Sequence, residues 1–312
     1  MEIVEWLLQS DPAIRWQVMR DLTSEPSDIV AAERSRVARE GWGGELLNLQ
    51  ESDGRWDGGT YRPGWADESK SFFDAWTATH FSLQLLVDFG VDPRSPRVQE
   101  AIRRVADSVR WPAGDGLYFE GEVEPCINGI VVVIGAYFTQ PVDGIVDRLL
   151  GDQLPDGGWN CWAAFGATVS SFHTTICVLE GLAAWQRAVG ASPDVEAARL
   201  RGEEYLLERR LFRSRSTGRV VDPRFTMLSF PVRWYYDVLR ALDYFRSTGR
   251  AWDDRCAEAV ESVADKSDAN GRWALENIHQ GPTHFEMEGP EGFPSRWNTL
   301  RAMRVLSWAG AS

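Results

Sequence analysis

The sequence lacks an apolar segment long enough to cross a membrane. Its longest uncharged apolar run, GIVVVIGAYF, covers only residues 129–138, whereas a membrane-spanning helix needs about 20 apolar residues. We therefore expect this run to lie in a buried helix. The first residues, MEIVEWLLQSD, lack the cationic segment and following apolar stretch of a secretory signal, so no signal peptide is expected there.

Cysteine and positive charge are also scarce. The four cysteines are widely spaced, which argues against a disulfide framework and favours free thiols in a reducing compartment. A cytoplasmic protein is therefore expected. The chain has 33 Lys and Arg residues against 46 Asp and Glu, a formal net charge of −13. This balance disfavours nucleic acid and anionic membrane surfaces as the main partners.

Strand signals are nearly absent, and long apolar helical segments take their place. Apolar residues lie on nearly every side of these segments, which predicts helices buried on both faces. The six segments are residues 12–22, 71–89, 125–138, 171–185, 231–245 and 294–308. Charged amphipathic segments between them, such as 96–109 and 196–212, suit an outer layer that faces water.

Alternation of inner and outer helices predicts an all-α fold, a closed α/α toroid with six inner helices. Residues 1–312 are expected to form this toroid as one domain. An open superhelix is the alternative, but it would leave apolar inner helices exposed at both ends. The first and last inner segments also share Arg-Trp starts, at Arg15-Trp16 and Arg296-Trp297, which favours closure.

A glycine-aromatic turn recurs along the chain and defines the repeats. It occurs at residues 50–56, 112–119, 153–159 and 267–273, with a weaker copy at 216–225. Its spacing fits units of two helices. Each turn is expected to use glycine at positive φ and to pack its aromatic ring between neighbouring units. The fifteen tryptophans suit this packing role, although a subset could line an aromatic cavity.

Two of these turns carry a family resemblance. QESDGRW (50–56) and QLPDGGW (153–159) match the Q-x-x-x-G-x-W half of the repeat typical of squalene and oxidosqualene cyclases, and RGEEYLLERR (201–210) is similar to the other half. The sequence thus resembles the terpenoid cyclase and protein prenyltransferase superfamily. The resemblance implies an α/α toroid with a central cavity, and an enzyme that acts there on a hydrophobic, isoprenoid-like small molecule.

The acid motif of class II terpenoid cyclases, D-x-D-D, is absent, and Asp253-Asp254 falls in an expected outer helix. Asp74, in FFDAWTAT, resembles the aspartate of the superfamily's W-D-T-A helix starts. Burial would raise the pKa of such a carboxyl and make it a candidate general acid. The alternative is an aspartate that caps a helix or pairs with an arginine.

The protein prenyltransferase branch implies a zinc site. There an acidic-x-Cys pair and a His at the next inner-helix start bind zinc. Glu124-Pro125-Cys126 and Phe172-His173-Thr174 match this order, with Glu in place of the usual Asp, and Cys161 in the turn between them is a further candidate ligand. Thiolate and imidazole are ligands that zinc prefers. The alternative is that the cysteines and His173 are packed core residues.

Further candidates lie in a loop and at two helix starts. In NIHQGPTHFEMEG (277–289), His284 could act catalytically at the cavity mouth, or the loop could simply be solvated. Arg233 and Tyr236, with Arg296 and Trp297, could orient an anionic or π-rich substrate. The alternative for these four is ion pairing and capping between helices.

The resemblance leaves the activity open between a cyclase-like reaction and a zinc-dependent transferase. A non-catalytic protein that binds a hydrophobic ligand, or an interaction scaffold, would suit the same fold. Protein prenyltransferases need a second helical subunit, so a partner subunit is not excluded.

Overall fold

The computed structural model describes residues 2–67 and 75–310. Their regular structure is helical, and β-pairing among them is limited to isolated bridges. No helix in this part of the chain is both long enough and apolar enough for a membrane span. The α-helices are α1 (Ile3–Leu8), α2 (Pro12–Asp21), α3 (Ser27–Val37), α4 (Gly41–Asn48), α5 (Thr79–Phe89), α6 (Pro96–Ser108), α7 (Pro125–Tyr137), α8 (Asp143–Gly151), α9 (Phe172–Val189), α10 (Pro193–Leu207), α11 (Val238–Ser247), α12 (Ala257–Ala264) and α13 (Arg296–Trp308).

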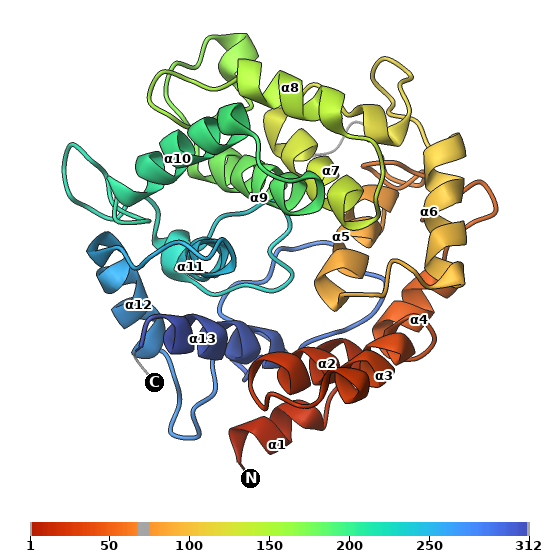
Figure 1. Cartoon of the computed structure of the whole chain (residues 1–312), viewed down its shortest axis with the longest axis horizontal. Helices are drawn as coiled ribbons and strands as arrows, with labels where there is room; N and C mark the ends of the chain where they lie inside the picture. The colour runs from red at the N-terminus through yellow and green to blue at the C-terminus, as the bar shows by residue number, and fades with distance from the viewer. Residues whose placement is uncertain (1, 68–74, 311–312) are drawn as a thin grey trace.

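The helices form an inner and an outer layer of one ring (Figure 1). The inner layer consists of α2, α5, α7, α9, α11 and α13, which correspond to the six apolar segments of the sequence. Helices α6, α8, α10 and α12 lie outside them. Helices α3 and α4 also lie in the outer layer, next to α2 and α5. The predicted all-α toroid is therefore confirmed.

The two ends of the chain meet and close the ring. On α13, Arg304 forms an ion pair of 2.5 Å with Asp21 and donates to the Gln17 side chain of α2 at 2.8 Å. The guanidinium groups of Arg272 and Arg296 lie 4.3 and 4.7 Å from the ring centre of Trp6 on α1. Helix α1 thus covers the junction between the first and last inner helices (Figure 1).

Helices α7 and α9 approach each other closely through glycine. A Cβ on Gly129 of α7 would lie 2.4 Å from the carbonyl oxygen of Cys177, and a Cβ on Gly181 of α9 would lie 2.6 Å from that of Gly129. Any side chain at either position would collide with backbone, so these glycines set the separation of the two helices.

The repeated turns have a packing role, as their recurrence predicts. In three of them the tryptophan indole donates to the end of the preceding outer helix, Trp56 to the Leu46 carbonyl at 2.7 Å and Trp159 to the Leu149 carbonyl at 2.7 Å. Trp273 makes the equivalent bond to Val263 at 2.6 Å. Gly157 has a φ of 97°, and a Cβ there would lie 2.5 Å from the Arg201 carbonyl oxygen. The copy at residues 112–119 differs, because its positive φ angles belong to Gly114 and to a non-glycine residue, Asp115.

Helix α11 begins later than predicted. Apolar residues suggested a start near 231, but the helix begins at Val238, after Asp237 accepts a capping hydrogen bond from the Arg240 backbone at 2.7 Å. A φ of 56° at Arg233 keeps the preceding segment out of helical geometry. This segment instead carries Arg233 toward the centre of the ring.

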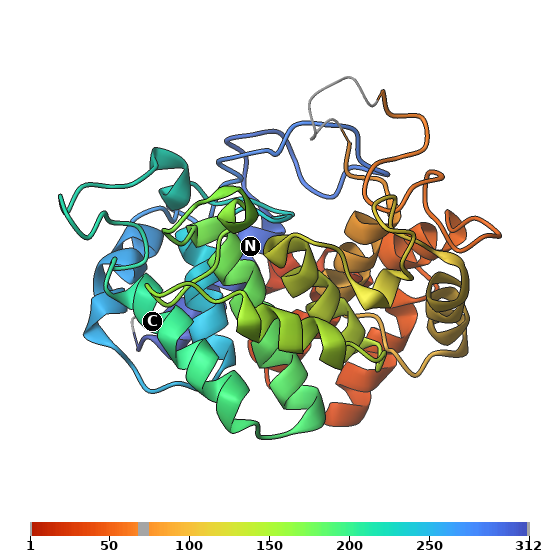
Figure 2. The same ribbon diagram turned by 90° about the horizontal axis from the view of Figure 1, so that it is seen from above.

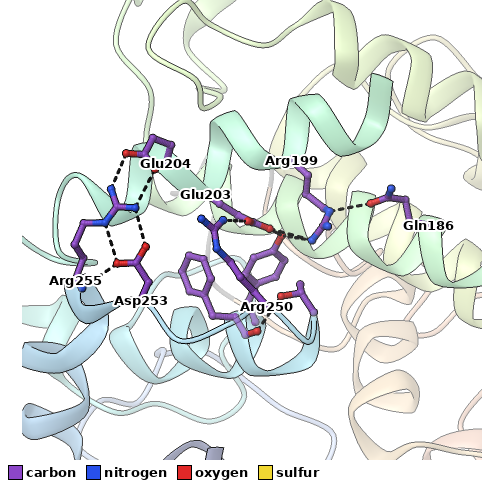
Figure 3. A network of polar contacts seen from close by, with 10 residues as sticks. Gln186, Arg199, Glu203, Glu204, Arg250, Asp253 and Arg255 are labelled. Atoms are coloured by element: carbon purple, nitrogen blue, oxygen red, sulfur yellow. Dashed lines mark hydrogen bonds and ion pairs between the residues drawn. The ribbon is translucent and has the colours of Figure 1, made fainter. Parts of the chain in front are cut away.

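A polar network joins outer helix α10 to the segment after α11 (Figure 3). Its centre is Glu203, whose side chain is 1% exposed and pairs with Arg199 at 2.9 Å and with Arg250. The Tyr244 hydroxyl donates to the same carboxylate at 2.7 Å. Because both carboxylate oxygens of Glu203 accept hydrogen bonds, its burial is compensated.

Candidate functional site

Three of the predicted metal ligands lie together at the start of α7. Glu124 is the residue before the helix, Pro125 occupies its first position and Cys126 follows in the first turn. Proline is favoured at this first position because its missing N–H would have no helical partner. Cys161 comes from the next repeat, just after the Trp159 turn. We call Glu124, Cys126 and Cys161 the rim cluster.

The ligand atoms of the rim cluster all lie within 4.8 Å of one another. The two sulfur atoms are 2.7 Å apart, and the Cys126 sulfur lies 3.7 Å from Oε2 of Glu124. The backbone N–H of Cys126 points at the Cys161 sulfur at 3.4 Å, and the Thr174 hydroxyl donates to that sulfur at 3.4 Å. These two donors hold the Cys161 sulfur in place.

The electrostatics of the rim cluster suit a bound cation. The hydrogen bond between the two thiols, together with burial, raises the pKa of the Cys126 thiol well above its usual value. Burial also raises the pKa of Glu124. Two thiolates and a carboxylate at this separation repel one another unless a cation lies between them. Two sulfurs and one oxygen are atom types that zinc accepts as ligands, and a catalytic zinc site has three protein ligands.

His173 does not join the rim cluster. Its Nδ1 accepts a hydrogen bond from the Tyr236 backbone at 2.8 Å, and its ring packs against Phe225 and Trp234. Consecutive residues of a helix point about 100° apart, so the α9 residue that reaches the thiols is Thr174. The expected helix start does lie beside Cys126, and the side chain that it turns toward the thiols is Thr174.

A cavity of about 630 Å³ borders the rim cluster, and Glu124 forms part of its wall. We call it the rim cavity. Its apolar wall comes from Tyr61, Pro63, Ala66, Trp111, Pro112, Ala113 and Ile127, and its charged residues are Arg55, Arg62, Arg110, Asp115, Glu122 and Glu124. The residues following Cys161 add an exposed aromatic pair, Trp162 and Phe165, which are 69% and 81% exposed.

The loop of residues 274–294 covers the centre of the ring. Figure 2 shows this segment beside the orange segment that precedes α5. The Trp76 backbone donates to the Pro282 carbonyl at 2.9 Å, and Nε2 of His284 lies 2.9 Å from the hydroxyl of Ser82 on α5. Burial lowers the pKa of His284. Because Ser82 is fully buried, this hydrogen bond fastens the loop and does not expose a nucleophile.

The four predicted substrate-orienting residues separate into two pairs. Tyr236 is buried, and its hydroxyl donates to the Leu211 carbonyl. Arg296 stacks on Trp6 as part of the ring closure. Arg233 and Trp297 do lie at the centre of the ring, 1% and 2% exposed. Arg233 lies 5.3 Å from the Trp76 ring centre, and Trp297 stacks on Phe230 at 4.4 Å.

Below these aromatic residues the centre of the ring is charged. Two adjoining cavities of about 220 and 180 Å³ share Asp88, Glu180 and Arg240 among their lining residues. Burial raises the pKa of Asp88 from 3.8 to about 7, although Arg301 opposes this shift. The repeat pattern of the sequence did not identify these residues. The available signal was the presence of single charged residues within otherwise apolar inner helices, as in LQLLVDF (83–89).

Asp74, the predicted general acid, lies outside the described residues.

No protein-family model and no curated protein matches the sequence. Among solved structures, two chains of the type II terpene cyclase MstE from Scytonema are similar over nearly the whole chain. An Asp-to-Asn variant in complex with its substrate geranylgeranyl dihydroxybenzoate is 16% identical, covers 97% of this chain and 88% of that chain, and gives a TM-score of 0.43. An apo Tyr-to-Phe variant is 17% identical, covers 96% and 87%, and gives a TM-score of 0.45.

Proposed function

We propose that the protein is a zinc-dependent enzyme that acts on an amphiphilic, isoprenoid-like small molecule in the rim cavity. The observation that carries the proposal is the position of Glu124, which belongs both to the rim cluster and to the cavity wall. A reacting group in the cavity would therefore lie beside the ligands Glu124, Cys126 and Cys161. When bound there, zinc would supply Lewis-acid polarisation or an activated nucleophile.

The cavity wall defines the substrate class. Its aromatic and aliphatic side chains, including Tyr61, Trp111 and Ile127, suit an apolar body. Arg55, Arg62 and Arg110 offer guanidinium groups to an anionic end of the substrate. The exposed rings of Trp162 and Phe165, with centroids 5.5 Å apart, extend the apolar surface next to Cys161.

The protein's own residues hold and orient the reacting groups. The Thr174 hydroxyl and the Cys126 backbone N–H both donate to the Cys161 sulfur, which fixes the orientation of its lone pairs. Glu124 occupies the position before α7, so its carboxylate is carried by a rigid helix start. Such support keeps a metal site in one geometry.

Metal analysis of the purified protein tests the zinc site. We expect one zinc per chain, lost in Cys126→Ser and Cys161→Ser and weakened in Glu124→Gln, because each change removes one of three ligands. The His173→Ala variant should keep its zinc, since His173 bonds to Tyr236. Cys256→Ser, which changes a buried cysteine elsewhere in the chain, is the matched control.

Two outcomes would contradict the zinc site. One is metal-free protein in which Cys126 and Cys161 form a disulfide, shown by thiol titration and mass spectrometry. The two cysteines would then be a redox pair and not zinc ligands. The other is a loss of zinc in His173→Ala as large as in Cys161→Ser, which would mean that His173 is a zinc ligand. The enzyme itself is tested with isoprenoid alcohols, acids and diphosphates; a zinc protein that binds these compounds and returns them unchanged would be a binding protein.

A further inference from the structure

We propose that the centre of the toroid holds a second binding site, for a small oxyanion such as a carboxylate or a phosphate. The site consists of the two adjoining cavities between the inner helices, here called the central cavity. All six inner helices contribute to its wall, as shown by Gln17 (α2), Asp88 (α5), Val133 (α7), Glu180 (α9), Arg240 (α11) and Arg301 (α13).

Arginines outnumber acidic residues in this wall. The arginines are Arg187, Arg240, Arg301 and Arg304, and the acids are Asp88, Glu180 and Asp243. Three ion pairs remove most of these charges: Arg240 with Glu180 at 2.5 Å, Arg304 with Asp21 at 2.5 Å, and Asp243 with Arg246 at 2.8 Å. Among the described residues, Arg187, Arg301 and Asp88 then have no ion pair.

Of the remaining arginines, Arg187 is exposed to solvent, whereas Arg301 and the neighbouring Arg233 are buried and poorly compensated. Arg301 is 8% exposed, and the hydrogen bond found for its guanidinium goes to a neutral group, the Ser229 carbonyl, at 3.1 Å. Arg233 adjoins this region, is 1% exposed, and its Nη1 has no hydrogen-bond partner in the described part of the chain. Burial lowers the pKa of Arg233 to about 9. A buried guanidinium without a carboxylate is costly.

An oxyanion resolves this imbalance better than other ligands. Its oxygens would accept hydrogen bonds from the guanidinium groups that lack a carboxylate partner, and Asp88 can donate a hydrogen bond when it is protonated. A cation would add to the excess positive charge, and an apolar ligand would leave the guanidinium groups desolvated. The volumes of about 220 and 180 Å³ limit the ligand to a small molecule.

The central cavity is separate from the proposed zinc site. Along α7, Cys126 belongs to the rim cluster, whereas Ile130, Val133 and Ile134 line the central cavity. The rise of about 1.5 Å per residue places Val133 roughly 10 Å further along the helix than Cys126. The two proposals can therefore fail independently.

Calorimetry and thermal unfolding with two probes, inorganic phosphate and succinate, test the site in the full chain. We expect saturable binding of at least one probe and a rise in Tm. The Arg301→Gln variant should weaken this binding by about tenfold or more, because it removes a charge-assisted hydrogen bond. Arg103→Gln, on the surface of α6 with a side chain 60% exposed, is the matched control and should bind as wild type does.

A blocking variant distinguishes the cavity from the surface. Val232 lines both of the adjoining cavities, so Val232→Phe narrows the whole central cavity without changing any charge and should abolish binding. Arg301→Lys keeps the positive charge if Arg301→Gln fails to fold, and should retain part of the affinity. Cys126→Ser should bind the probes normally, which separates this site from the zinc proposal.

The relative response to phosphate and succinate identifies the preferred oxyanion. The proposal is overturned if neither probe binds saturably to folded wild-type protein at millimolar concentration. It is equally overturned if folded Val232→Phe binds either probe as tightly as wild type does, because binding would then occur outside the cavity.

Discussion

At the scale of single residues, the environment of the Asp88 carboxyl favours its protonated form. Its carboxyl borders the central cavity and lies in the field of Arg301, Glu180, Arg233 and Arg240. Burial outweighs the attraction of the arginines and raises its pKa from 3.8 to about 7. The folded protein therefore keeps this proton over a pH range in which the unfolded chain has released it.

This shift predicts how stability depends on pH. Below about pH 4 both states are protonated, so Asp88 costs nothing; between pH 4 and 7 stability falls, and above pH 7 the loss is complete. At about 1.4 kcal/mol per pKa unit, the loss at pH 8 is on the order of 4 kcal/mol. We expect Asp88→Asn to raise the free energy of unfolding at pH 8, and to raise it much less at pH 5.

Denaturant unfolding at the two pH values, in buffer without phosphate or carboxylates, measures this difference. Asp115→Asn controls for the loss of one negative charge, because the Asp115 side chain is 84% exposed. An equal effect of Asp88→Asn at both pH values would show that the carboxyl is ionised in the folded protein.

The direction in which single side chains of α9 point also determined which residues lie at the candidate zinc site. The sequence placed a Cys at one inner-helix start and a His at the next, and these helices do pack together. A shift of one residue around α9 turns His173 toward Tyr236 and Thr174 toward Cys161. Sequence spacing alone cannot resolve that angle, because the rotation of a buried helix depends on packing against both neighbours.

At the scale of elements, the close contact of α7 with α9 is the most demanding. Helix α7 is apolar on nearly all sides, so propensity alone would tolerate alanine at Gly129 and even favour it. The space for a Cβ is missing, however, because the Cys177 carbonyl would lie only 2.4 Å away. Sterics therefore oppose helix propensity at this position.

We predict that Gly129→Ala destabilises the protein by about 1–3 kcal/mol, the usual cost of overpacking. Gly144→Ala on outer helix α8 is the matched control, because a Cβ there meets nothing within 4 Å, and it should be neutral or stabilise by up to about 1 kcal/mol. Chemical denaturation of both variants checks the prediction. Equal stability of the two would mean that α7 and α9 can separate at little cost.

At the scale of the whole molecule, closure of the ring depends on contacts between its ends. The ion pair of Arg304 with Asp21 joins α13 to α2, and their side chains are only 7% and 19% exposed. Without Asp21, the Arg304 guanidinium would keep the Gln17 side chain as a partner but would lose its carboxylate. Removing one member of a largely buried ion pair leaves an uncompensated charge.

Asp21→Asn is therefore expected to cost about 2–4 kcal/mol, somewhat less than for a fully buried pair. Hydrogen exchange should quicken first in α1, α2 and α13, while α7 and α9 keep their protection. Asp107→Asn, which removes an exposed ion pair with Arg103 on α6, should cost at most about 1 kcal/mol. Uniformly faster exchange throughout the molecule would contradict a local role in closure.

The sequence by itself determined the all-α repeats, the six inner helices and the turns around Trp56, Trp159 and Trp273. These features depend on local patterns, namely helical periodicity, glycine at positive φ and an aromatic ring at a fixed offset. The same kind of local signal placed Glu124, Cys126 and Cys161 at helix starts and turns that the fold brings to one rim.

Only the tertiary structure decided what lies at the centre. The sequence suggested a cavity lined by aromatic residues, whereas the structure places Arg233, Trp76 and Trp297 above cavities lined by Asp88 and several arginines. Residues far apart in the chain converge there, and their charges shift one another's pKa only at close range. Such convergence depends on the rotation of each inner helix, which no repeat pattern specifies.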